Sequence, residues 1–271
     1  MDSKDNDDNA ALIVASENGD KEVCELLITR GSNVDMQIND GSTALIVASQ
    51  NGHKEVCELL ITRGYNVDMQ NKDGGTALIY ASEEGHKEVC ELLITRGCNV
   101  DMQNNDGSTS LMVASGKGHK EVCELLITRG SKVYMQNNNG TTALIFASQN
   151  GHKEVCELLI TRGCNVDMQD KLGNTALLIA SLKGHKEVCE LLITRGSKVD
   201  MQNNNGSTAL MNASIDGHIP VIISFIRAGC DCSLRNKKGK SGMDYLREKH
   251  ADKVKEVEVS HSLTAVVTHS S

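Results

Sequence analysis

Six cysteines recur at intervals of 33 residues, and thiols at a regular spacing can serve as metal ligands, disulfide partners or nucleophiles. They are Cys24, Cys57, Cys90, Cys123, Cys156 and Cys189. Each falls on the apolar side of a predicted helix, and neighbouring packed helices lie about 8–10 Å apart. That separation exceeds the roughly 7 Å limit between the Cα atoms of a disulfide and the roughly 2 Å reach of a shared zinc ion. We therefore interpret these thiols as small buried apolar groups.

The other four cysteines lie in predicted loops. Cys98, Cys164 and Cys230 are 66 residues apart, and Cys232 follows Cys230 after a single residue. Cys230-Asp231-Cys232 is the only close pair, and without a second pair it is weak support for zinc. We predict no metal and no cofactor. Ten cysteines behind an N-terminus without an apolar signal segment favour a reducing compartment, namely the cytoplasm, with the nucleus as the alternative.

A second ladder consists of histidines, which could act as general bases or metal ligands. They are His53, His86, His119, His152, His185 and His218. Catalysis needs a unique and asymmetric group of side chains, and a series of near-identical copies offers none. The sequence also has no phosphate-binding loop, no H-E-x-x-H and no G-x-S-x-G. We expect the histidines to hold the loops in which they lie, and we predict that the protein is not an enzyme.

Composition excludes two further classes of function. The chain has 28 Lys plus Arg against 36 Asp plus Glu, a formal charge of −8, whereas nucleic-acid binding needs clustered positive charge. Aromatic residues make up only 2% of the chain, which leaves little for bases to stack on. No apolar stretch approaches the roughly 18 residues that a membrane span requires. We predict a protein that binds neither nucleic acid nor membrane.

The whole chain is organised by a 33-residue period. The string GHKEVCELLITRG returns five times almost unchanged, starting at Gly52, Gly85, Gly118, Gly151 and Gly184. The predicted repeats are 6–38, 39–71, 72–104, 105–137, 138–170, 171–203 and 204–236, followed by a partial cap at 237–257. A period of this length is typical of a solenoid.

The repeat 39–71 predicts two helices and a turn. Thr43 is a good N-cap for a short apolar helix over residues 44–50, and Gly52 suits the left-handed conformation that follows a helix. A second helix is expected from about His53 to Thr62, with its apolar residues on one face. The end of the repeat and the start of the next carry turn residues. Such a unit cannot bury its apolar face alone, so the units must stack into one elongated core.

This unit, DGSTALIVASQNGHKEVCELLITRGYNVDMQ, resembles an ankyrin repeat. It has the family's G-x-T-x-L opening, then A-x-x-x-G-H, E-V-x-x-L-L and a closing G-x-x-V. The family's Thr-Pro-Leu-His reads Thr43-Ala44-Leu45-Ile46 here, so the prolines at helix starts and that histidine network are missing. The resemblance implies an all-α solenoid of stacked helix-turn-helix units with β-turn fingers.

The resemblance covers nearly the whole chain apart from its two ends. We expect an acidic segment at 1–9, the repeat array at 10–257 and a disordered tail at 258–271. The first repeat has Ala10 where the next has Thr43, so Asp8 or Asn9 is expected to cap its helix instead. Pro220 falls in the first turn of a predicted helix, where proline is tolerated.

Candidate partner-binding residues lie where the copies differ, in the turns and at the ends of the first helices. The resemblance implies that turns and first helices line the concave groove through which ankyrin arrays bind proteins. The alternative is neutral drift at exposed positions. The candidates are Asp40, Gln50, Asn51, Asp73, Glu83, Glu84, Asp106, Lys117, Asn139, Gln149, Asn150, Leu172, Leu182, Lys183 and Ile215.

Two features predict the kind of partner. The first three repeats carry a net charge of −10 and the next four +1, so the N-terminal end favours a partner with a basic segment. Leu172, Leu182 and Ile215 are apolar where other repeats carry polar residues, which is typical of an interface anchor.

We predict a monomeric, non-catalytic module that binds a protein or peptide and acts as a scaffold, adaptor or inhibitor. One alternative is a fragment of, or substrate receptor for, a larger enzyme system such as a ligase or kinase. Another is a structural spacer without a tight ligand.

Overall fold

The computed structural model describes residues 3–259 and divides the chain into two compact units, Met1–Asn138 and Asn139–Ser271. Both units are built from paired helices, and the described residues form no strand; two of them, Gln103 and Thr109, make an isolated bridge. The predicted all-α class is therefore confirmed.

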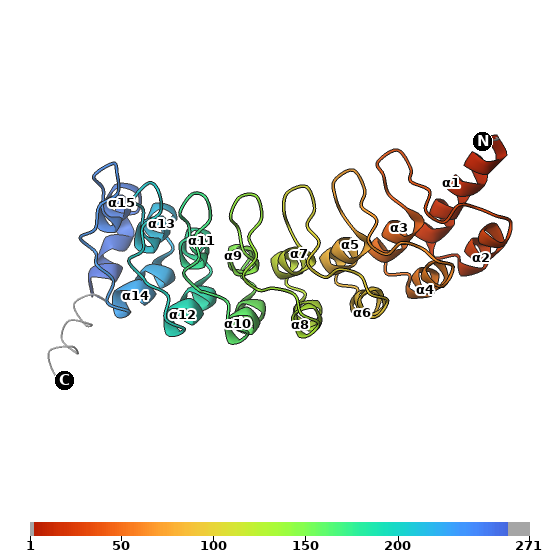
Figure 1. Ribbon diagram of the computed structural model, residues 1–271. Coiled ribbons are helices and arrows are strands. Elements are labelled where there is room, and N and C mark those ends of the chain that lie inside the picture. The colour runs from red at the N-terminus through yellow and green to blue at the C-terminus, as the bar shows by residue number, and fades with distance from the viewer. Residues whose placement is uncertain (1–2, 260–271) are drawn as a thin grey trace. The chain divides into compact units, whose positions relative to one another are not determined.

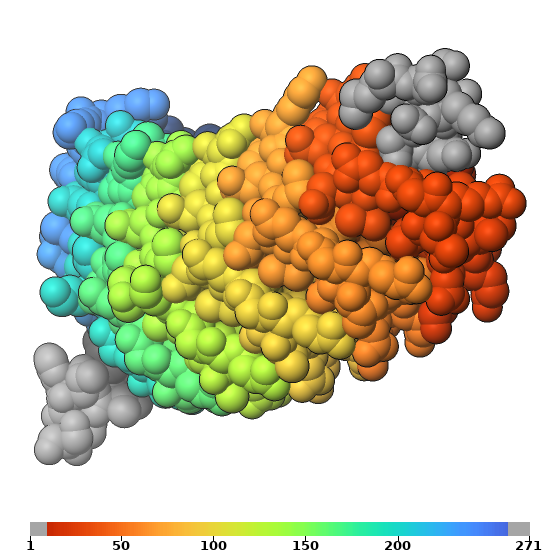
Figure 2. Space-filling view, turned by 45° about the vertical axis from the view of Figure 1, so that its right-hand side comes forward, coloured from red at the N-terminus to blue at the C-terminus, as the bar shows by residue number. Residues whose placement is uncertain are grey.

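The first unit contains four helix pairs (Figure 1). The first helices pack side by side in one row and the second helices in another, and the turns project beyond the first-helix row. Figure 2 shows the repeats of this unit as successive bands from red to yellow, each against the next. The helices are α1 (Ser3–Asn18), α2 (Lys21–Thr29), α3 (Ala44–Gln50), α4 (Lys54–Thr62), α5 (Ala77–Glu84), α6 (Lys87–Thr95), α7 (Ser110–Lys117) and α8 (Lys120–Thr128).

The second unit repeats this arrangement and ends in a shorter element. First helices again pack on first helices and second helices on second helices. The elements are α9 (Ala143–Gln149), α10 (Lys153–Thr161), α11 (Ala176–Lys183), α12 (Lys186–Thr194), α13 (Ala209–Asp216), α14 (Ile219–Arg227), α15 (Gly242–Lys249) and the 3₁₀ turn η1 (Ala251–Lys253). Pro220 lies in the first turn of α14, as predicted.

The first helix of a repeat begins at the threonine that the sequence indicates. The hydroxyl oxygen of Thr43 accepts a hydrogen bond from the backbone N–H of Ile46 at 3.3 Å. After α3, Gly52 has a φ of +77°, a left-handed conformation in which a side chain is strained. The expected bounds of α3 are confirmed, and α4 begins at Lys54, one residue after the expected start.

Apolar burial holds the two helices of a repeat together. In α3, Leu45 and Ile46 are buried, and in α4, Val56, Cys57 and Leu60 are buried. These positions recur on the same helix faces in the other repeats, so stacking extends one apolar layer along each unit. Removal of this surface from water, at about 25 cal/mol per Å², is the main force that stabilises the stack.

The predicted start of the first repeat is wrong. α1 begins at Ser3 and runs through the positions of Asp8 and Asn9, which were expected to cap a later helix. No glycine or proline interrupts residues 3–18, so nothing in the backbone prevents the helix from extending toward the N-terminus.

The second unit ends with a helix that packs on the seventh repeat. The Ser241 hydroxyl caps α15 by accepting a hydrogen bond from the backbone N–H of Asp244, and α15 packs against α13. Most of the predicted tail at 258–271 lies outside the described residues, which end at 259.

Candidate functional site

The ladder of six cysteines is structural, as predicted. All six thiols are free and buried. The Sγ atom of Cys57 lies 3.4 Å from the hydroxyl oxygen of Ser49 on the partner helix of the same repeat. Burial raises the pKa of the Cys57 thiol to about 12 and that of the Cys90 thiol to about 11. A thiol with so high a pKa is almost entirely protonated at neutral pH and is a poor nucleophile.

We expect these buried thiols to resist a thiol reagent in the native protein. With Ellman's reagent at pH 8, Cys57, Cys90, Cys123, Cys156 and Cys189 should stay unmodified, and they should react once the chain is unfolded in urea. Peptide mapping of the modified cysteines provides the measurement. Rapid modification of these five in the native chain would contradict the packing described above.

The histidine ladder ties each repeat to the one before it. The Nε2 atom of His86 lies 3.0 Å from the carbonyl oxygen of Gln50. Because a carbonyl only accepts, Nε2 must carry the proton in this bond. The imidazole also packs on Gly52, where an added Cβ would come within 2.7 Å of the ring. The same bond joins His53 to Glu17, His119 to Glu83, His185 to Gln149 and His218 to Leu182.

One member of this ladder was missed by the sequence analysis. The Nε2 atom of His250 lies 3.2 Å from the carbonyl oxygen of Ile215. His250 follows His218 by 32 residues and lies at the end of α15, whereas the other histidines precede a helix. It therefore breaks both the period and the local motif by which the ladder was found.

The predicted residues of the turns are exposed, and their backbones are bound to the next repeat. In the first unit, the carbonyl oxygen of Asp40 accepts a hydrogen bond from the Lys72 N–H at 2.9 Å. Asp73 and Asp106 accept the equivalent bonds at 2.9 and 2.8 Å. In the second unit, Asn139 and Leu172 do so at 2.9 and 3.0 Å. The side chain of Asp40 is also used within its own turn, where Oδ1 accepts the Ser42 N–H at 2.8 Å.

The predicted residues at the first-helix ends also share a fixed backbone. The carbonyl oxygens of Gln50, Glu83, Gln149, Leu182 and Ile215 are the acceptors of the histidine ladder. The other members, which lie beside these, are exposed: Asn51, Glu84, Lys117, Asn150 and Lys183.

Some of these side chains already have partners within the first unit. Lys117 Nζ lies 3.3 Å from Glu83 Oε1, so two candidates from adjacent repeats form an ion pair. Asn51 Nδ2 donates to the carbonyl oxygen of Val47 at 2.9 Å. A partner that uses these three side chains must exchange existing contacts for new ones.

The apolar candidates of the second unit fall into two places. Leu182 and Ile215 are half-buried at equivalent positions of α11 and α13, which pack on each other. Leu172 is 67% exposed and lies in the turn before α11. The structure therefore brings Leu182 and Ile215 to neighbouring helix ends and places Leu172 on a separate element of the same surface.

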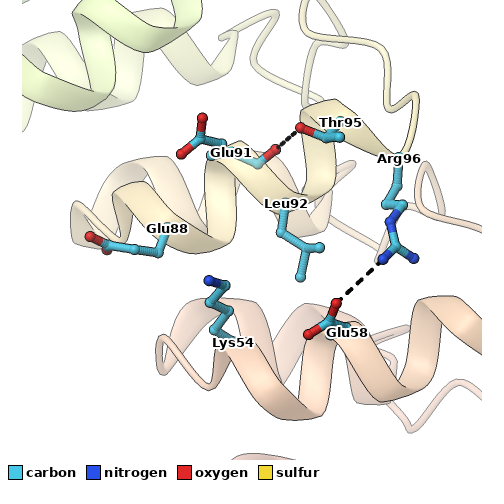
Figure 3. A pocket seen from close by; sticks show the side chains of 7 residues that line it. All are labelled: Lys54, Glu58, Glu88, Glu91, Leu92, Thr95 and Arg96. Carbon is cyan, nitrogen blue, oxygen red and sulfur yellow. Dashed lines mark hydrogen bonds and ion pairs between the residues drawn. The ribbon is translucent and has the colours of Figure 1, made fainter.

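A shallow pocket of about 340 Å³ lies between the second helices α4 and α6 (Figure 3). Across it, Arg96 Nη2 is 3.4 Å from Glu58 Oε1, an exposed pair worth at most about 1 kcal/mol. The sequence analysis missed the pocket because its residues recur unchanged in neighbouring repeats, and no predicted partner-binding residue lines it. The lining residues are Lys54, Glu58, Glu88, Glu91, Leu92, Thr95 and Arg96.

The N-terminal repeat exposes an apolar face. Val23 and Leu26 of α2 are 45% and 50% exposed, whereas the equivalent Val56 and Leu59 of α4 are 1% and 8% exposed. In later repeats the preceding repeat covers this face. The first repeat therefore carries the sequence of an internal repeat at an end position, without the polar outer face that a terminal repeat usually has.

Within residues 3–259, no three His, Cys, Asp or Glu side chains gather where they could hold a metal ion. Among the same residues, no helix has the length and apolar character needed to cross a membrane.

Comparisons with known proteins agree on the architecture. A family model described as ankyrin repeats (3 copies) matches residues 12–104, 55–137, 93–170 and 158–236. Among solved structures, the crystal structure of the human ASB11 ankyrin repeat domain is similar with a TM-score of 0.73. The two share 24% sequence identity over 82% of this chain and 98% of that one, so the likeness concerns the fold. No curated protein sequence matches the chain.

Proposed function

The chain belongs to the ankyrin-repeat family, and we propose that it binds a protein partner through its turns and first-helix ends without catalysing a reaction. Ankyrin repeats are in general protein–protein interaction modules. In this role the chain acts as a scaffold, an adaptor or an inhibitor, according to what its partner does.

One observation carries the proposal: variable side chains project from a backbone that is bound at each repeat. The carbonyl group of each turn candidate accepts a hydrogen bond from the next repeat, and the first-helix ends are bound through the histidine ladder. A backbone fixed in this way loses little conformational entropy when a partner binds. The exposed side chains are then free to differ from repeat to repeat without disturbing the fold.

In the second unit we propose an apolar contact with the partner. Leu172 is 67% exposed at a position where five other repeats have Asp, Asn or Lys. Leu182 and Ile215 add apolar surface at the helix ends of the same unit. An apolar cluster surrounded by polar residues is typical of an interaction site. An extended partner segment with a large apolar side chain fits this surface.

In the first unit we propose an electrostatic contact. Its first three repeats carry a net charge of −10, and Asp40, Asp73 and Glu84 are exposed on the turn and first-helix side. A surface of this charge attracts Lys and Arg side chains and speeds the encounter with a basic segment. The reduced cysteines favour action as a monomer in the cytoplasm.

The test is capture of partners with matched variants. The intact chain is immobilised and exposed to native lysate, and retained proteins are quantified by mass spectrometry. A triple variant, Leu172→Ser, Leu182→Ser and Ile215→Ser, should lose a partner that the unaltered chain retains. A control variant, Tyr134→Ser, removes an equally prominent side chain (60% exposed) outside the proposed surface and should keep that partner.

Circular dichroism of each variant must show unchanged helix content for the comparison to hold. Equal retention by the triple variant and the unaltered chain would overturn the apolar contact. Failure of every chain to retain any protein would overturn the binding function itself and favour a structural spacer.

A further inference from the structure

The loop between α14 and α15 is the only predicted loop in which two cysteines occur together. The repeat position of Cys230 holds Ser32, Tyr65, Cys98, Ser131, Cys164 and Ser197 in the other repeats. The position of Cys232 holds valine in all six: Val34, Val67, Val100, Val133, Val166 and Val199. Two substitutions at otherwise apolar or polar positions thus place a pair of thiols in this one loop.

The two thiols lie close together and near the surface. The Sγ atoms of Cys230 and Cys232 are 3.9 Å apart, and both residues are half-buried, unlike the fully buried cysteines of the ladder. A disulfide has an S–S distance of about 2.05 Å, so the sulfur atoms must approach by about 2 Å. Rotation of two side chains in an exposed loop supplies a movement of this size.

Hydrogen bonds hold the loop around Asp231. The Asp231 N–H donates to Asp200 Oδ1 of the preceding repeat at 3.0 Å. Its own Oδ1 accepts from the N–H and the hydroxyl of Ser233 at 2.8 and 2.6 Å. Asp231 is thus fixed on both sides, and the flanking thiols are kept on one short segment.

The pair also gives the thiols unequal acidity. The hydrogen bond from the Cys230 thiol lowers the pKa of Cys232 to about 7, although burial and the carboxylates of Asp231 and Asp200 act in the opposite direction. The same hydrogen bond, with burial, raises the pKa of Cys230 well above its usual range. Cys232 is therefore the better nucleophile at neutral pH, and Cys230 retains its proton.

We propose that Cys230 and Cys232 form a modification site at which a hydroperoxide produces a disulfide within the loop. The Cys232 thiolate attacks one oxygen of the peroxide, the O–O bond breaks, and the other oxygen takes a proton and leaves as water or an alcohol. The resulting sulfenic acid is then attacked by the Cys230 sulfur. An S–S bond forms, the S–O bond breaks, and the hydroxyl group leaves with the Cys230 proton as water. The two thiols lose two electrons, and the peroxide gains them.

The chain contains its own controls. Cys98 and Cys164 occupy the position of Cys230 but are followed two residues later by Val100 and Val166. The variant Cys232→Val gives the last loop the residue found in the other six, so it is expected to fold. The variant Cys230→Ser keeps the proposed nucleophile and removes the thiol that resolves the sulfenic acid.

The experiment treats the intact, reduced chain with graded hydrogen peroxide at pH 7. Remaining thiols are then blocked, and the chain is digested and mapped by mass spectrometry without reduction. We expect a Cys230–Cys232 disulfide before Cys98 or Cys164 is oxidised. Cys232→Val should form none, and Cys230→Ser should accumulate a sulfenic acid at Cys232 that dimedone traps.

A second readout uses alkylation by iodoacetamide. At pH 7, Cys232 should react at least about tenfold faster than Cys98, since burial raises the pKa of Cys98 to about 12. Its rate should rise with pH and level off above about pH 8. The proposal is overturned if Cys98 and Cys164 are oxidised as readily as the pair. It is also overturned if Cys230→Ser yields no sulfenic acid at Cys232.

Discussion

Replacing Val56 by aspartate should destabilise the protein by about 3–5 kcal/mol, because the substitution buries a carboxylate without a partner. Val56 is 1% exposed in α4, where the preceding repeat covers it. The same replacement at Val23, which is 45% exposed in α2, should cost less than about 1 kcal/mol. Both residues lie in the identical helix sequence KEVCELLIT, so the two variants differ only in their place in the stack.

Urea unfolding followed by circular dichroism compares Val56→Asp and Val23→Asp with the unaltered chain. The midpoint should fall markedly for the first variant and change little for the second. If both variants are equally destabilised, the apolar face of the first repeat is covered, contrary to the exposure described here.

Gly52→Ala is expected to cost about 2–4 kcal/mol, from two causes acting together. The φ of +77° strains any residue with a Cβ atom, and that atom would also lie 2.7 Å from the His86 ring. The imidazole can move only by losing its hydrogen bond to the Gln50 carbonyl. The substitution therefore weakens the contact between two repeats as well as the turn within one.

Gly64 provides the matched control for this second prediction. Its φ is +93°, and an added Cβ would meet no atom within 4 Å. Gly64→Ala should therefore show the backbone strain alone, about 1 kcal/mol. The double variant Gly52→Ala with His86→Ala removes the clash and should be less destabilised than the sum of the two single changes. Equal losses for Gly52→Ala and Gly64→Ala in urea unfolding would show that His86 does not pack on Gly52.

Sequence reasoning was most successful where one repeat determines its own structure. The Thr43 cap, the helix over Ala44–Gln50 and the left-handed Gly52 depend on residues close together in the chain. The burial of Cys57 was also predictable, since its position on the helix face follows from the helical period. Local rules suffice for these features, and 33-residue repetition applies them to each copy.

The features that were not predicted depend on a neighbouring repeat or on the end of the array. Nothing in the identical helices α2 and α4 distinguishes Val23 from Val56, and only the absence of a preceding repeat exposes the former. The acceptor of the His86 bond lies 36 residues earlier, beyond the reach of a local motif. Among the candidate site residues, exposure matches the expectation for Asp73 and Leu172, while their part in binding stays a prediction.

The central claim is that turns and first-helix ends bind the partner and that second helices do not. The most direct measurement is the affinity of a captured partner, by isothermal titration calorimetry, for two variants of the second unit. We predict that the triple serine variant of Leu172, Leu182 and Ile215 loses at least about 30-fold in affinity. Glu157→Ala with Arg195→Ala, which breaks an exposed ion pair on the second helices, should lose less than about threefold. The reverse order of effects would place the partner on the second-helix face and contradict the account.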